Sequence, residues 1–127
     1  MNFSLAIVGS RNFHEYTSFK QQINIALNNM NLEITDFDYI VSGGAKGTDT
    51  LAEKLAVDIN IPTKIFHAKW RMNGIYNKHA GTDRNTKIVD ACTHMIAFIA
   101  EDSIGTWDSV NKAEHANKIV YKIHVKL

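Results

Sequence analysis

The chain is organised around one segment, Phe37-Asp38-Tyr39-Ile40-Val41-Ser42-Gly43-Gly44-Ala45-Lys46-Gly47-Thr48-Asp49. Residues 37–41 form an apolar run typical of a strand, residues 42–49 form a glycine-dense turn, and a helical pattern begins directly behind it. Glycines let a backbone approach a ligand closely, and free N–H groups at the start of a helix attract anions such as phosphate. A strand, a glycine loop and a helix in this order predict a site for a nucleotide-like ligand.

Strand-like and helical patterns alternate along the rest of the chain. Apolar runs typical of strands cover 3–8, 38–41, 63–67, 94–99 and 119–125, and helical patterns cover 15–30, 51–59, 80–89 and 106–116. The polar stretch 69–76 is predicted as an irregular loop, and the polar alternation in 119–125 predicts a sheet edge. Strands that alternate with helices imply right-handed crossovers. We therefore expect an α/β fold, doubly wound, with a mostly parallel sheet of about five strands and helices on both faces.

Composition restricts the class of protein. The 127 residues, 45% of them hydrophobic, fit one domain covering 1–127. The 14 basic and 13 acidic residues give a net charge of +1 without any run of like charges, which argues against duplex nucleic acid as a partner. The apolar stretch 1–8 is too short for a signal sequence and no segment approaches a membrane span, so we expect a cytoplasmic protein without a membrane partner.

The cysteine and histidine patterns argue against a disulfide, a metal site and a nucleophilic enzyme. Cys92 is the only cysteine, which excludes an internal disulfide and suits a reducing compartment. The six histidines show no paired metal spacing, and no serine or cysteine nucleophile motif is present. We expect neither a metal nor a cofactor.

Ligands of doubly wound sheets bind beyond the carboxyl ends of the strands, where four loops of this chain should meet: 9–13, 43–48, 68–76 and 101–106. The glycine loop is not a Walker A motif, because Lys46 precedes the last glycine. Its amides could cradle a phosphate, or the loop could be an ordinary strand-to-helix turn. Thr50 and Glu53 form a possible capping box that would start the helix after Thr48.

The other loops offer further polar groups. Arg11, which follows Gly9 and Ser10, can hold a phosphate with two parallel hydrogen bonds or remain solvated. Thr106 follows Gly105, so a glycine and a hydroxyl again precede a helical pattern, as in the glycine loop. Alternatively, Thr106 simply caps the helix. Trp70 could stack on a base or plug the edge of the core.

As a series, these motifs resemble the DUF2493 proteins, the YspA/YpsA-related branch of the SLOG superfamily. The motifs that carry the resemblance are Gly9-Ser10-Arg11-Asn12-Phe13, Ser42 to Asp49 with Ala52 and Ala56, Ala68-Lys69-Trp70 with Gly74, Ala80-Gly81, Arg84-Asn85, Ala97-Phe98 and Ser103-Ile104-Gly105-Thr106. The resemblance covers nearly the whole chain in the same order. It implies a Rossmann-like fold, binding of a nucleotide or nucleotide-derived small molecule through these loops, and a homo-oligomer.

The expected function is therefore a non-catalytic module that senses or sequesters such a ligand. In this interpretation Arg11 and Arg84 neutralise phosphate and Trp70 faces the base. The expected ligand-binding residues are Gly9, Ser10, Arg11, Gly43, Gly44, Lys46, Gly47, Thr48, Asp49, Trp70, Arg84, Asn85, Gly105 and Thr106.

Two alternatives remain at this stage. The LOG-type phosphoribohydrolases pair an arginine, which Arg84 resembles, with a glutamate; here Ser109 occupies that position and Asp108 lies one residue early, which argues against N-glycosidic hydrolysis. The third interpretation is single-stranded nucleic-acid binding, because the glycine loop is similar to the serine-glycine-x-alanine-x-glycine-isoleucine-aspartate loop of the DNA-processing protein family. We rank it last, since the basic surroundings of that family are absent from the sequence pattern and a stacking platform would need more than Trp70 and Trp107.

Overall fold

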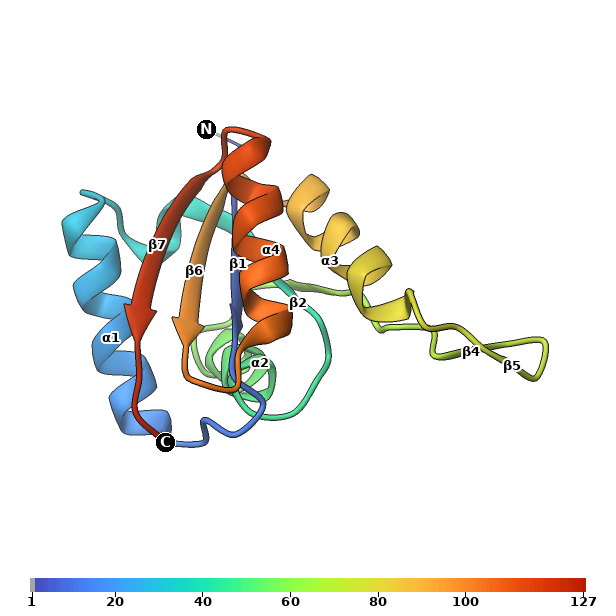
Figure 1. Ribbon diagram of the computed structural model, residues 1–127. Coiled ribbons are helices and arrows are strands. Elements are labelled where there is room, and N and C mark those ends of the chain that lie inside the picture. Colours follow the sequence, from blue (N-terminus) through green and yellow to red (C-terminus); the bar gives the residue numbers. More distant parts are fainter. Residues whose placement is uncertain (1) are drawn as a thin grey trace.

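Five parallel strands form the central sheet, and helices cover both of its faces (Figure 1). This computed structural model describes residues 2–127, so Met1 of the N-terminal apolar stretch lies outside the described residues. The strands of the sheet are β1 (Phe3–Gly9), β2 (Phe37–Ser42), β3 (Thr63–Ile65), β6 (His94–Ile99) and β7 (Ile119–His124), in the spatial order β3-β2-β1-β6-β7. The helices are α1 (Tyr16–Asn29), α2 (Thr48–Asp58), α3 (Ala80–Ala91) and α4 (Ile104–His115), with a 3-10 turn η1 (Ile34–Asp36) before β2.

Alternate residues of the central strand β1 supply two separate apolar clusters. Leu5 and Ile7 belong to the cluster that α1 and α2 cover, whereas Ala6 and Val8 belong to the cluster that α3 and α4 cover. Side chains of a strand point alternately to the two faces, so one strand can serve both layers. Strand β6 is buried along its whole length, as expected for a parallel strand covered on both faces. The predicted Rossmann-like, doubly wound α/β fold is confirmed.

Two helix starts differ from the sequence patterns. Helix α2 begins at Thr48, with Gly47 as its N-cap residue. Thr50 donates its hydroxyl to the carbonyl of Ala45 and Glu53 accepts a hydrogen bond from Ser42, so these two residues form no capping box. Helix α4 begins at Ile104, so Thr106 lies inside its first turn and is not the cap.

The stretch 69–76, predicted as irregular, contains a β-hairpin. Strands β4 (Arg71–Met72) and β5 (Ile75–Tyr76) pair antiparallel across Asn73 and Gly74, whose φ angles are 53° and 78°. Two consecutive residues with positive φ are typical of a type I′ turn, for which Asn-Gly is the strongest short signal. The prediction missed the hairpin because each of its strands has only two residues.

The order of the strands reverses next to β1. The chain runs from β1 outward to β2 and β3 on one side, then returns to β6 and β7 on the other. The loops after β1 and β6 therefore diverge, and a crevice opens between them at the carboxyl ends of the strands. Within residues 2–127 no helix combines the length and the apolar character needed to span a bilayer.

Candidate functional site

The glycine loop joins the loop that follows β1. Thr48 donates both its amide and its hydroxyl to the carbonyl oxygen of Ser10, at 3.1 and 2.9 Å. A Cβ at Gly47, which has a φ of 73°, would lie 2.5 Å from the backbone of Arg11, and one at Gly9 would lie 2.6 Å from the carbonyl oxygen of Phe98. Glycine at both positions lets the two loops pack directly against each other.

Several amides of the glycine loop bond to the protein itself. Gly44 donates its amide to the Ser42 hydroxyl at 3.2 Å, and Ala45 donates its amide to the Asp49 carboxylate at 3.1 Å. With Thr48 already bonded to Ser10, three of the amides expected to bind phosphate have protein acceptors. The glycine loop therefore holds the walls of the site in place. The positive charge of the site comes from side chains outside this loop.

Arg84 extends from α3 to the glycine loop. Its Nη1 donates to the carbonyl oxygen of Gly43 at 2.7 Å, and its Nε donates to the side-chain oxygen of Asn85 at 3.0 Å. Asn85 in turn donates to the carbonyl oxygen of Gly105 at 3.2 Å and to Asp108 at 3.0 Å. These bonds tie α3 to the glycine loop on one side and to α4 on the other, and they hold the guanidinium at the edge of the crevice.

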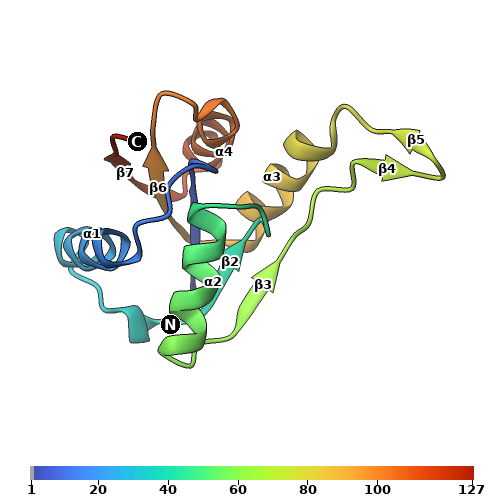
Figure 2. The ribbon, with the colours of Figure 1, turned by 90° about the horizontal axis from the view of Figure 1, so that it is seen from below.

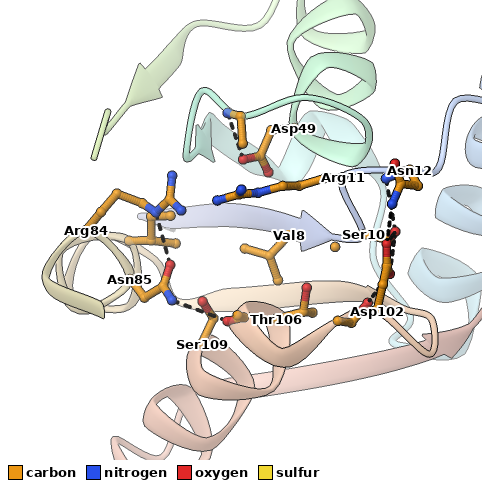
Figure 3. Close-up of a pocket in the computed structure, with 15 residues that line it drawn as sticks. Val8, Ser10, Arg11, Asn12, Asp49, Arg84, Asn85, Asp102, Thr106 and Ser109 are labelled. Atoms are coloured by element: carbon orange, nitrogen blue, oxygen red, sulfur yellow. Dashed lines mark hydrogen bonds between the residues drawn. The ribbon is translucent and has the colours of Figure 1, made fainter. Parts of the chain in front are cut away.

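Arg11 extends toward Arg84 from the opposite side of the crevice, with Asp49 beside both (Figure 3). Burial raises the pKa of Asp49 to about 6, although the Ala45 amide and the positive charges of Arg84 and Arg11 oppose the shift. Burial also lowers the pKa of Arg84, which Asp49 partly offsets, and a guanidinium remains charged at any physiological pH. This end of the crevice is therefore cationic, with two fixed positive charges and one carboxyl that changes charge near neutral pH.

Asp102 closes the other end of the crevice. Its two carboxylate oxygens accept from the Ser10 hydroxyl at 2.8 and 3.0 Å, and Oδ2 accepts from the Asn12 amide group at 2.6 Å. The hydrogen bond from Ser10, with that from Asn12, lowers the pKa of Asp102. The site is thus polarised, because Asp102 is bound to the β1 loop while the arginines face the crevice at the opposite end.

The crevice has a volume of ≈ 410 Å³. Its lining contains eight of the predicted ligand-binding residues: Gly9, Ser10, Arg11, Asp49, Arg84, Asn85, Gly105 and Thr106. The other predicted residues lie outside the lining: Gly43, Gly44, Lys46, Gly47, Thr48 and Trp70. Lys46 is exposed, and Trp70 lies next to the hairpin.

Sequence reasoning missed part of the lining. The missed residues are Val8, Asn12, Ala45, Ile88, Asp102, Ser103 and Ser109. Asp102 and Ser103 lie in the loop after the buried strand β6. Their position beyond the carboxyl end of a central parallel strand could have identified them as site residues from the sequence. Asp108, named for the hydrolase alternative, is absent from the lining and accepts from Asn85 and Lys112. Among residues 2–127 no group of three potential metal ligands gathers.

Positive charge is concentrated in one part of the chain. Residues 67–87 contain five of the 14 basic residues and one of the 13 acidic ones, so this segment carries +4 and the remainder −3. The five are Lys69, Arg71, Lys78, Arg84 and Lys87. The basic residues alternate with other residues and form no run, so the sequence pattern does not show basic surroundings.

The fold and the crevice define a parallel α/β protein with a cationic crevice at its topological switch point. The model of the family described as DNA recombination-mediator protein A matches residues 1–124. The chain belongs to this family.

Two solved structures are similar to this chain. DNA processing protein A from Streptococcus pneumoniae superposes with a TM-score of 0.70 at 21% identity, over 95% of this chain and 50% of that one. DNA processing protein A from Helicobacter pylori, whose structure is described as giving insight into its single-stranded DNA binding mode, has a TM-score of 0.69 at 19% identity, over 94% of this chain and 64% of that one. The present chain thus spans less than two thirds of either relative. No curated protein matches it.

The family match corrects the sequence-based assignment. Placement in the DUF2493 branch of the SLOG superfamily is wrong, and so is the main interpretation of a module whose partner is a nucleotide-like small molecule. The third interpretation, single-stranded nucleic-acid binding, agrees better with the family. It was ranked last because the basic segment 67–87 has no run of like charges and because only tryptophans were counted as stacking residues.

Proposed function

We propose that this chain binds single-stranded DNA, with a phosphate of the strand held between Arg11 and Arg84. Family membership supports the proposal, and so does the described DNA-binding mode of the Helicobacter pylori relative. Two guanidinium groups that converge from opposite walls suit a phosphate, since each can donate two parallel hydrogen bonds to its oxygens. We also propose that the protein acts in the cytoplasm, a location consistent with DNA binding.

The position of Arg84 is the observation on which the proposal depends. Its hydrogen bonds to Gly43 and Asn85 fix the guanidinium, so little side-chain entropy is lost when a phosphate binds. A crevice of ≈ 410 Å³ can take part of one strand.

Fluorescence anisotropy with a labelled oligo(dT) tests the proposal. Arg84→Gln and Arg11→Gln should each weaken binding, and each should reduce the slope of log K against log salt by about 0.7, the value for one phosphate contact on a single strand. Lys118→Gln, which removes a positive charge between α4 and β7 at the other edge of the sheet, is the matched control and should bind as the wild type does. Absence of oligo(dT) binding by the wild type, or equal loss in all three variants, would overturn the proposal.

A further inference from the structure

The hairpin of β4 and β5 projects away from the body of the molecule. Figures 1 and 2 show it beyond the end of α3, on the far side of that helix from the sheet. All four of its strand residues are exposed, among them Met72 at 52%, Ile75 at 72% and Tyr76 at 60%. We call residues 69–78 the hairpin arm. An exposed apolar surface at the tip of a projecting element is typical of an interaction site.

The hairpin arm has a defined geometry at its base. Asn77 donates its amide to the carbonyl oxygen of Trp70 at 2.7 Å, next to the Arg71–Tyr76 pair. The rings of Trp70 and Tyr76 lie nearly parallel, with centroids 6.3 Å apart and planes 9° from each other. Trp70 also lies against α3, since a Cβ at Gly81 would be 3.3 Å from its indole. The two rings therefore form an ordered pair with large exposed surfaces, 40% for Trp70 and 60% for Tyr76.

Basic residues flank this aromatic pair in the sequence of the hairpin arm. Lys69, Arg71 and Lys78 all belong to the hairpin arm and are exposed, and the arm contains no acidic residue. Parallel aromatic rings offer π-faces on which bases stack, and neighbouring cations attract the phosphates between them. A single-stranded nucleic acid presents both groups together. A purely apolar protein partner would leave these charges without counterions, so a nucleic-acid strand fits the arm better.

The hairpin arm is continuous with the cationic end of the crevice. A second depression of ≈ 150 Å³ is lined by residues of the arm, including Lys69, Met72 and Asn77, and by Asp83, Arg84 and Lys87 of α3, so its lining contains three basic side chains and one acidic one. Arg84 lines both this depression and the crevice. A strand whose phosphate binds at Arg84 thus has a basic path toward the aromatic pair.

We infer that the hairpin arm is a second contact region for single-stranded DNA, in which bases beyond the crevice stack on Trp70 and Tyr76. This inference rests on the proposed function, because it assumes that the strand is anchored at Arg11 and Arg84. It predicts that the arm adds affinity only for strands long enough to reach it.

Two oligo(dT) lengths test the inference by anisotropy: about 4 nucleotides and about 15 nucleotides, which span the usual range of single-strand site sizes. Trp70→Ala combined with Tyr76→Ala should weaken binding of the longer strand at least about fivefold, the lower limit for loss of one stacked base. Binding of the shorter strand should not change. Trp70→Phe with Tyr76→Phe, which keeps two rings, is the matched control and should retain binding of the longer strand.

Tryptophan emission gives a second readout. The chain has two tryptophans, so Trp107→Phe leaves Trp70 as the single emitter. Stacking on a base should quench this emission with the longer strand and not with the shorter one.

The outcomes separate the two proposals. If the wild type binds both strands and the alanine pair changes neither affinity, the inference is wrong and the proposed function stands. Equal weakening of binding to both oligonucleotides also overturns the inference, and so does weaker binding by the phenylalanine pair. In either case the arm would act on the crevice or on the fold. If the wild type binds no strand, both proposals fail.

Discussion

Arg84 and Gly43 are 41 residues apart in the sequence, and a 2.7 Å hydrogen bond joins the guanidinium of the first to the carbonyl oxygen of the second. The bond holds a positive charge beside the buried carboxyl of Asp49, which carries the opposite charge when ionised. One contact thus links the folding of the glycine loop to the charge of the crevice.

Arg84→Gln should lower the free energy of unfolding at pH 7.5 by about 1–3 kcal/mol, because Asp49 would lose a positive neighbour and Gly43 a donor. Urea denaturation of Arg84→Gln, Asp49→Asn and the double variant measures the coupling between the two groups. The double variant should be more stable than the sum of the single effects predicts. Additive effects would mean that the two groups do not interact.

Affinity for single-stranded DNA should rise as the pH falls from 7.5 to 5. The pKa of Asp49 is about 6, so protonation leaves Arg11 and Arg84 without their nearby negative charge. We expect a change on the order of fivefold, about 1 kcal/mol for one charge near a surface phosphate. Anisotropy titrations across this range should give a flatter profile for Asp49→Asn than for the wild type. Identical profiles for the two proteins would contradict the prediction.

The same carboxyl should make stability depend on pH. Its pKa is about 6 in the folded protein and 3.8 without the protein environment, so the folded state binds this proton more tightly. The free energy of unfolding should therefore fall as the pH rises from 4 to 6, by up to about 3 kcal/mol at 1.4 kcal/mol for each pH unit. Urea denaturation at several pH values should show a smaller fall for Asp49→Asn than for the wild type. Parallel curves for the two proteins would show that Asp49 does not cause the pH dependence of the free energy of unfolding.

Two glycine substitutions should have opposite effects on stability. Gly47→Ala places a Cβ 2.5 Å from the backbone of Arg11 at a φ of 73°, so it should destabilise the fold by about 2 kcal/mol or more. Gly105→Ala meets nothing within 4 Å and lies in α4, where alanine should stabilise by about 0.5–1 kcal/mol. Thermal denaturation of both variants checks the difference. A neutral Gly47→Ala would show that the two loops can separate at little cost.

Some parts of the site follow from local pattern alone. The loops that follow β1 and β6 lie at the carboxyl ends of parallel strands. Ligands of such sheets generally bind beyond these ends. Gly9 and Arg11 were therefore predicted from sequence and line the crevice. Asp102 lies in the loop 101–106 that was placed at this edge, but its contacts were not predicted, because its partners Ser10 and Asn12 are 92 and 90 residues away. No local pattern reports a contact of that range.

The sequence by itself determined the class of fold and the edge of the sheet at which the crevice lies. It could do so because the periods of buried residues and the positions of glycines are local properties that folding preserves. Tertiary structure alone decided how the residues at that edge are used. It bonds the amides of Gly44, Ala45 and Thr48 to the protein, brings Arg84 to Gly43, and pairs Trp70 with Tyr76 across a hairpin. These relationships depend on which segments meet in space, which long-range packing sets.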